Sequence, residues 1–297
     1  IVELTGSDMA TRREVLELSL LTGTSLVTPV LHWAATVSPA AARPRQLGTV
    51  EIDDLERAVA MFQAWDASGV GGLHRKAVVG QLNAVAEALH EQRSPDTQGR
   101  LFHVAAELAQ LAGWMTFDAG LCGPAQRYFL YALDACGQTG AVDLAAKIIG
   151  DMAQVSNSRK QYGDSLTMVR TALGSLSRGA NPLVRSELHG HEAVTYARLG
   201  PAEVTQACRS VDRSIEEFER ATLEARQRWN QYMDRAEVEC LAGGAFIRLA
   251  LESSKPNKAQ EYARRAEEHV LNAIGSRGEQ FSRSRFLDEI RLSKVRV

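Results

Sequence analysis

The sequence His189-Gly190-His191-Glu192 is the place where residue types and spacing most directly suggest chemistry. Two histidines separated by one residue, with an acid beside them, hold a metal ion when they lie on a strand. The surrounding pattern is helical, however, and residues two apart on a helix point roughly 200° apart around its axis. The two imidazoles then cannot share an ion, and we expect no metal site here.

Other motifs of enzymes are missing or incomplete. The GVGG segment (69–72) lacks the Lys-Ser/Thr of a phosphate loop and the preceding strand of a dinucleotide fold, so it predicts a turn. No GxSxG or HExxH sequence is present. The cysteines are widely spaced and form no CxxC pair: Cys122, Cys136, Cys208 and Cys240. We therefore expect a protein without catalytic activity or a cofactor, in a reducing cytoplasm.

Composition favours helices and a soluble protein of ordinary surface. Of the 297 residues, 45% are hydrophobic, 24% are charged and only 6% are aromatic. The formal net charge of −2 excludes a surface that grips nucleic acid throughout, although a local basic patch is compatible with it. Two short basic clusters occur, at 42–46 and 283–296, and neither resembles a compact recognition helix.

The first 49 residues have a composition of their own. Arg12 and Arg13 precede an apolar stretch, as in a twin-arginine export signal. Acidic residues follow the arginines directly, and Pro29 and His32 interrupt the apolar run. We favour an amphipathic helix followed by a Pro/Ala-rich linker over residues 1–49, with an export signal as the alternative.

From residue 50 to residue 297 the pattern is helical. Apolar residues recur at spacings of three and four, as in Leu101, Val104, Leu108 and Leu111. Turn signals separate these runs at 68–72, 93–99, 120–124, 178–182, 198–201 and 253–257. No stretch alternates with a period of two for long enough to predict a strand, so the fold class is all-α.

Small residues at fixed positions suggest a repeat. Gly113 lies seven residues before the turn glycine Gly120, and Ala125, Phe129 and Ala132 follow that turn. This spacing resembles a tetratricopeptide repeat, in which small residues let two helices approach closely. Ala109 stands where that repeat usually has Trp, and the usual Tyr is displaced by one place at 116–117.

The same spacing of small and large residues recurs along the chain. It is found at Ser165, Val169 and Ala172, at Ala207, Val211 and Ser214, and at Ala259, Ala263 and Ala266. These recurrences predict that residues 50–297 form a right-handed α-solenoid of degenerate tetratricopeptide-like hairpins. The last two recurrences, which start at Ala207 and Ala259, are 52 residues apart. This interval leaves room for a long helix over 221–241.

The chain as a whole resembles a known family. The segments 66–89, 111–140 and 228–243 are similar to the C-terminal part of actinobacterial transcriptional regulators of the Xre type. In that family a helix-turn-helix head precedes a tetratricopeptide-like region, and the segment RREVLEL (12–18) is similar to the link between them. The resemblance implies a role in transcriptional regulation in the cytoplasm, with DNA contacted only through a head that these residues do not contain.

A solenoid of this kind binds along the surface formed by the first helix of each pair. The repeat register places ten residues there: Gln110, Trp114, Phe117, Asp118, Lys147, Gln154, Asn157, His191, Val194 and Arg198. An aromatic floor with amide and charged walls suits a peptide or a small amphipathic ligand, because an Asn or Gln side chain pairs with both N–H and C=O of an extended backbone. The alternative for Trp114 and Phe117 is that they are core residues.

Two functions follow from these observations. The first is a sensor, in which ligand in the concave groove changes the geometry of a regulator. The second is a constitutive interaction scaffold or dimerisation domain without a small ligand. The final helix leaves Phe286, Leu287, Ile290 and Leu292 with no following helix to cover them, so we expect either a partner subunit or the N-terminal helix at 16–23, folded back, to cover them. No segment is apolar for long enough to span a membrane.

Overall fold

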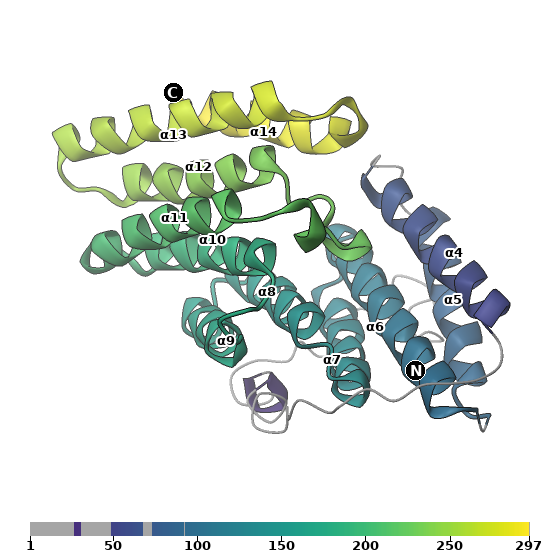
Figure 1. Ribbon diagram of the computed structural model, residues 1–297. Coiled ribbons are helices and arrows are strands. Elements are labelled where there is room, and N and C mark those ends of the chain that lie inside the picture. The colour runs from purple at the N-terminus through teal and green to yellow at the C-terminus, as the bar shows by residue number, and fades with distance from the viewer. Residues whose placement is uncertain (1–26, 31–48, 68–72, 92, 297) are drawn as a thin grey trace. The chain divides into compact units, whose positions relative to one another are not determined.

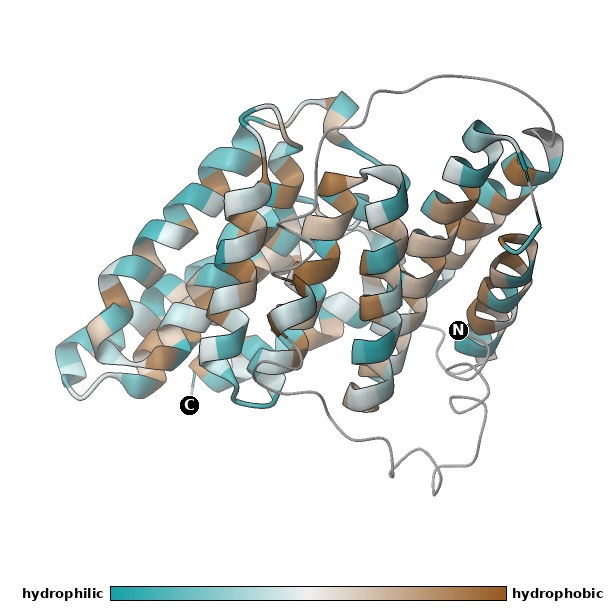
Figure 2. Cartoon of the chain, turned by 90° about the horizontal axis from the view of Figure 1, so that it is seen from below, coloured by the Kyte–Doolittle hydropathy of each residue, from teal (hydrophilic) through white to brown (hydrophobic). Residues whose placement is uncertain are grey.

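The computed structural model describes residues 27–30, 49–67, 73–91 and 93–296. Every regular element in these ranges is helical, and none of the described residues forms a strand, which confirms the all-α class. Hydrophobic and hydrophilic residues alternate around the helices, as the periodicity predicted (Figure 2). The predicted N-terminal helix and linker, the GVGG turn and the basic cluster at 42–46 lie outside the described residues, except for a short helical segment at 27–30.

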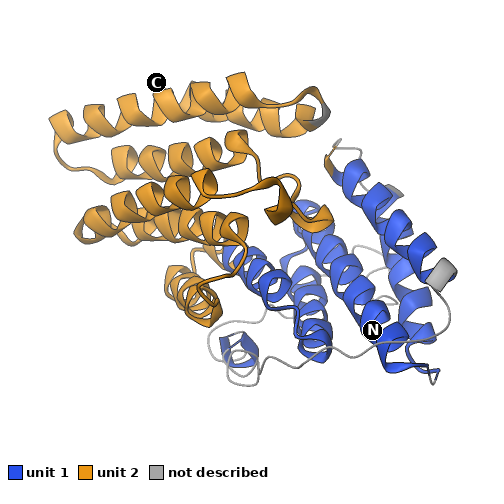
Figure 3. Ribbon diagram, viewed as in Figure 1, with its two compact units in different colours: residues 1–66, 70–155 blue, residues 67–69, 156–297 orange. Residues whose placement is uncertain are grey.

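The chain packs as two compact units (Figure 3). Unit 1 contains residues 1–66 and 70–155, and unit 2 contains 67–69 and 156–297. The helices of unit 1 are α4 (Thr49–Ala67), α5 (Leu73–Ala88), α6 (Pro95–Asp118), α7 (Cys122–Thr139) and most of α8 (Val142–Ser158). The last turn of α8 belongs to unit 2. A single solenoid over 50–297 remains a prediction.

Unit 2 continues with six further α-helices, and neighbours along the chain pack in pairs (Figure 1). They are α9 (Tyr162–Ser175), α10 (Pro182–Leu199), α11 (Val204–Glu219), α12 (Arg235–Glu252), α13 (Pro256–Ser276) and α14 (Ser282–Val295). Short 3₁₀ turns lie at Pro201–Glu203, Leu223–Ala225, Arg228–Asn230 and Glu279–Phe281.

The small residues of the segment predicted to be a repeat lie on α6 and α7, two helices that pack together. Ala125 and Ala132 are fully buried, and a Cβ atom on Gly113 would lie 2.7 Å from the ring of Phe129. Only glycine therefore lets the aromatic ring sit against the backbone of α6. Gly120 has a φ of 81°, a left-handed conformation that places the chain for its reversal into α7.

The segment 221–241 is not a long helix, so that prediction is wrong. Residues Leu223–Ala225 and Arg228–Asn230 form 3₁₀ turns, and α12 begins only at Arg235. Local hydrogen bonds explain the interruption. The side chain of Asp234 accepts from the backbone N–H of Glu237 and caps α12, and Gln227 and Asn230 form a reciprocal capping box around the second turn.

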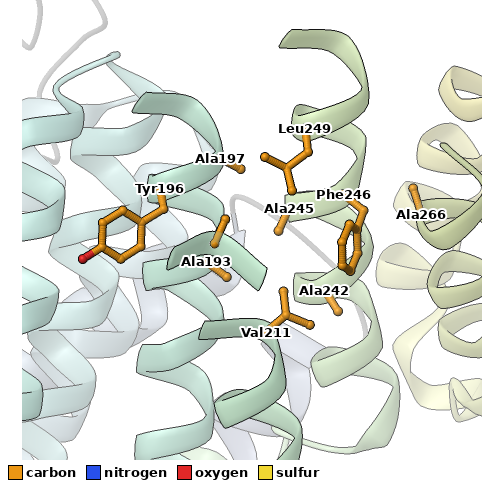
Figure 4. Close-up of a cluster of buried hydrophobic side chains, with 10 residues drawn as sticks. Ala193, Tyr196, Ala197, Val211, Ala242, Ala245, Phe246, Leu249 and Ala266 are labelled. Atoms are coloured by element: carbon orange, nitrogen blue, oxygen red, sulfur yellow. The ribbon is translucent and has the colours of Figure 1, made fainter. Parts of the chain in front are cut away.

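The core of unit 2 lies around α10, α11 and α12. A buried cluster there contains Ala193 of α10, Val211 of α11 and Phe246 of α12 (Figure 4), and the Phe246 ring stacks on His269 of α13 with centroids 5.5 Å apart. Close approach again depends on glycine: a Cβ on Gly190 would lie 2.6 Å from the Leu241 side chain, and one on Gly243 would lie 2.8 Å from Val270. The helices α10, α12 and α13 are thereby held close together.

Helix α14 is attached in a different way. Its one buried residue is Asp288, which accepts hydrogen bonds from Arg277 at 2.9 and 3.2 Å and from Arg291 at 2.7 Å. Three apolar side chains of α14 are exposed: Phe286 by 61%, Leu287 by 39% and Ile290 by 36%. Leu292 is half-buried. The expectation that apolar residues of the last helix lie uncovered is thus confirmed for three of the four.

Candidate functional site: two buried polar clusters

The first polar cluster lies in unit 1, and we call it the Asp151 cluster. Gln110 of α6 donates to Asp151 of α8 at 2.8 Å, and Lys147 donates to both oxygens of Asp151 at 2.7 Å. The Lys147 ammonium lies 5.9 Å from the centre of the Trp114 ring. Lys147 and Asp151 are only 3% and 1% exposed, so a buried carboxylate neutralises a buried ammonium at the centre of this cluster.

The remaining predicted residues of unit 1 lie at its edge. The rings of Trp114 and Phe117 are tilted against each other with centroids 5.7 Å apart, and both side chains are half-buried. Asp118, the last residue of α6, is exposed. Gln154 is half-buried on α8. The two rings therefore form a partly accessible aromatic surface, neither wholly core nor wholly open.

The second polar cluster lies in unit 2, where the end of α8, the start of α9 and α10 meet. We call it the Asn157 cluster. The side-chain Nδ2 of Asn157 donates to Thr195 Oγ1 at 2.7 Å, and Ser165 Oγ lies 3.1 Å from the same Thr195 atom. Arg198 donates from Nη1 to the main-chain oxygen of Asn157 at 3.4 Å, and its guanidinium carbon lies 5.8 Å from the centre of the Tyr162 ring.

Several polar atoms of the Asn157 cluster have no hydrogen-bond partner among the described residues. They are Ser156 Oγ, Asn157 Oδ1, Gln161 Oε1 and Arg198 Nε. All the described residues together contain nine such buried side-chain atoms, so four of the nine lie in this cluster. Asn157 is only 5% exposed. Buried polar atoms in native proteins are nearly always hydrogen-bonded, so a concentration of exceptions requires an explanation, such as a water, an ion or a ligand.

The other predicted residues of α10 contact different neighbours. His191 Nε2 lies 3.5 Å from Glu187 Oε1, and the main-chain oxygen of His191 accepts from Thr195 Oγ1. Val194 packs against the hydrophobic core around α12. His189 pairs with a second carboxylate, that of Glu192, at 3.2 Å. The two histidines of the HxH sequence therefore lie against separate acids.

Burial and hydrogen bonds shift the pKa of several titratable side chains. Burial opposes ionisation of Glu192, but hydrogen bonds from His189 and Ser210 outweigh it and lower the pKa of this carboxyl. Burial raises the pKa of the thiols of Cys136 and Cys240 far above the ordinary value. These two thiols stay protonated at neutral pH and are poor nucleophiles.

Three important residues of these clusters were not identified from the sequence: Asp151, Tyr162 and Thr195. A signal was present for two of them. Asp151 follows Lys147 by four residues and Thr195 follows His191 by four, the spacing at which side chains share a helix face. Tyr162 opens α9 directly after a turn and gives no comparable signal.

Two kinds of feature are absent from the described residues: a metal centre and a helix that could cross a membrane. Within the described residues no group of three His, Cys, Asp or Glu side chains is arranged to hold a metal ion. The same residues contain no helix that is both long enough and apolar enough to cross a bilayer. Comparison of the chain with family models, with curated proteins and with solved structures finds no match. Function must therefore be argued from the clusters themselves.

Proposed function

We propose that the chain is a ligand-sensing module and that its ligand, a peptide or a small molecule, binds at the Asn157 cluster. The observation that carries this proposal is that the cluster contains both a buried acceptor, Asn157 Oδ1, and a buried donor, Arg198 Nε. Neither atom has a hydrogen-bond partner in the described chain. An unsatisfied buried polar atom costs about 1–3 kcal/mol. A ligand that satisfies both atoms recovers this cost as binding free energy.

Arg198 and Tyr162 lie beside Asn157 at the edge of the cluster. Both side chains are half-buried, and the guanidinium stacks over the ring. The aromatic ring of Tyr162 supplies an apolar wall for the ligand.

Helix α10 connects the cluster to the rest of unit 2. Thr195 and Arg198 contact Asn157 from this helix, and Gly190 of the same helix packs against Leu241 of α12. A ligand that prefers one position of α10 therefore acts directly on the packing of α12. Sensing requires such a difference in affinity between two arrangements. A role in a cytoplasmic transcriptional regulator rests on the family resemblance alone.

Native mass spectrometry tests this proposal. We expect the purified protein to carry a bound molecule, or to bind members of a mixed peptide and metabolite extract, and we expect Asn157→Ala to abolish the binding. Asn257→Ala is the matched control, because it makes the same change at an exposed position of α13. Equal ligand occupancy in the wild type and in Asn157→Ala would contradict the proposal.

A second function, an interaction or dimerisation scaffold, is favoured by one observation. The exposed Phe286, Leu287 and Ile290 form an apolar surface on α14, a helix attached through a buried ion pair. Analytical ultracentrifugation of the wild type and of Phe286→Ser/Ile290→Ser tests it. A dimer that the double substitution dissociates favours the scaffold, and a wild-type monomer at high concentration excludes self-association through this surface.

A further inference from the structure

Thr195 determines which way the amide of Asn157 points. Thr195 Oγ1 lies 2.7 Å from the main-chain oxygen of His191, and a carbonyl oxygen can only accept. The single hydroxyl proton of Thr195 is therefore used in that bond. Its oxygen then accepts from Asn157 Nδ2 at 2.7 Å and from the Ser165 hydroxyl at 3.1 Å. This hydroxyl makes three hydrogen bonds, the full number it can form.

Reversal of the Asn157 amide is unfavourable for the same reason. It would place Oδ1 against a Thr195 oxygen whose proton is already used, so two acceptors would face each other in a buried site. Thr195 and Ser165 are fully buried, which makes that arrangement costly. The network therefore fixes Oδ1 of Asn157 as the group left for a ligand.

The cluster thus presents one acceptor and one donor of fixed identity. Arg198 Nε can only donate, because a guanidinium group carries N–H donors and no acceptor. The ionised oxygens of a carboxylate or phosphate satisfy Arg198 but cannot donate to Asn157 Oδ1. A peptide can satisfy both, because one of its N–H groups donates to Asn157 and one of its C=O groups accepts from Arg198.

We propose that the ligand is recognised through its peptide groups and that Thr195 is the positioning residue that sets this preference. The inference rests on the proposed function, which it narrows from ligands in general to amides. A further acceptor supports a peptide of more than one residue: Gln161 Oε1, at the start of α9, also lacks a partner in the described chain. An extended peptide offers N–H groups at regular intervals to such acceptors.

Two probes and three variants test this proposal by ¹H–¹⁵N NMR titration. The probes are a pool of N-acetylated, C-amidated random hexapeptides and inorganic phosphate. The variants are Thr195→Val, which keeps the shape and loses the hydroxyl, Thr195→Ser, which keeps the hydroxyl, and Asn157→Asp. The side-chain amide signals of Asn157, identified by their loss in Asn157→Asp, report contact at the cluster itself.

We expect the wild type to bind the peptide pool at least tenfold more tightly than phosphate. Thr195→Val frees the Asn157 amide to reverse, so its affinity for peptide should fall about tenfold, as expected for one net hydrogen bond, and its affinity for phosphate should rise. Thr195→Ser should restore the wild-type preference. If Thr195 has a purely structural role, Thr195→Val should lower the affinity for both probes by the same factor.

Other outcomes overturn the inference separately from the proposed function. If the wild type binds peptide and phosphate equally, or if Thr195→Val keeps the wild-type preference, the amide inference is wrong while the ligand site stands. If neither probe shifts the Asn157 signals, both are wrong. Should Thr195→Val fail to fold, Asn157→Asp decides, because a negative acceptor at this position must reject phosphate even more strongly; tighter phosphate binding by this variant contradicts the inference.

Discussion

The Asp151 cluster and the Asn157 cluster are built from the same kinds of residue and end in different states. Each has an amide, Gln110 or Asn157, that reaches to another helix. Each also has a cation beside an aromatic ring, at 5.9 Å for Lys147 and Trp114 and at 5.8 Å for Arg198 and Tyr162. In unit 1 a carboxylate completes the set, whereas in unit 2 two hydroxyls take its place and leave an acceptor and a donor unsatisfied.

Residue type and helical register therefore do not by themselves distinguish a structural cluster from a binding site. The presence of a third group does, because it decides whether the buried charges and amides are satisfied within the protein. Asp151 has that role in unit 1. We therefore expect the Asp151 cluster to stabilise unit 1 and the proposed ligand to bind at the Asn157 cluster.

Replacement of the central carboxylate should have the largest effect. Asp151→Asn removes the negative charge to which both Lys147 and Gln110 donate, in a site that is almost wholly buried. Breaking a buried ion pair in this way costs about 3–5 kcal/mol. Chemical denaturation should show a loss of that size, with Asp134→Asn, at an exposed position of α7, unchanged. A loss below about 1 kcal/mol would mean that this cluster does not stabilise unit 1.

Glycine substitutions compare the helix contacts of the two units. Gly113→Ala places a methyl group against the rigid ring of Phe129, so we expect a loss of about 1–3 kcal/mol. Gly190→Ala meets the flexible side chain of Leu241 and should cost less. Gly137→Ala, on α7 with open space around it, is the control and should be neutral or stabilising by about 1 kcal/mol. If thermal denaturation shows a larger loss of stability for Gly190→Ala than for Gly113→Ala, this ranking of the two helix contacts is wrong.

Loss of the Asn157 side chain should affect stability only slightly. Asn157→Ala removes the hydrogen bond to Thr195 but also removes the unsatisfied Oδ1, so the two effects largely offset each other. We expect a change below about 1 kcal/mol in the free energy of unfolding, measured in urea. A loss as large as that of Asp151→Asn would assign Asn157 to the structure instead of the ligand.

Acid should weaken unit 2 through Glu192, an effect smaller than that of the buried ion pair. Its pKa is lowered in the folded protein, so its contribution to stability is full above the ordinary glutamate pKa of about 4.3 and is lost as the pH falls below it. Glu192→Gln should lower stability at neutral pH and flatten its decrease between neutral pH and acid. Parallel pH profiles of the wild type and this variant would exclude the effect.

The helical class and the key small residues were predictable because their signals are periodic. Spacings of three and four indicated the helices, and the small-residue spacing pointed to Gly113, Ala125 and Ala132, which are buried, with Gly113 against Phe129 of α7. The segment 221–241 was predicted wrongly because local capping by Asp234 and Asn230 interrupts a favourable helical pattern. Such competition between side-chain and backbone hydrogen bonds is weakly visible in a sequence.

The candidate site was predictable only in part. Among the residues predicted to share one surface, the structure brings Gln110 and Lys147 together through Asp151, and Asn157 together with Arg198. The register did not show that Asp151 satisfies the first pair while nothing in the described chain satisfies Asn157 Oδ1 and Arg198 Nε. That distinction depends on the positions of individual atoms across three helices, and helical periodicity carries no information at that scale.

The most direct test of the central claim measures two quantities on the same two variants. For Asp151→Asn and Asn157→Ala, the free energy of unfolding and the affinity for the capped hexapeptide pool are determined side by side. The account predicts that Asp151→Asn loses about 3–5 kcal/mol of stability, and that Asn157→Ala loses peptide binding while its stability stays nearly unchanged. Wild-type peptide affinity in Asn157→Ala would contradict the account.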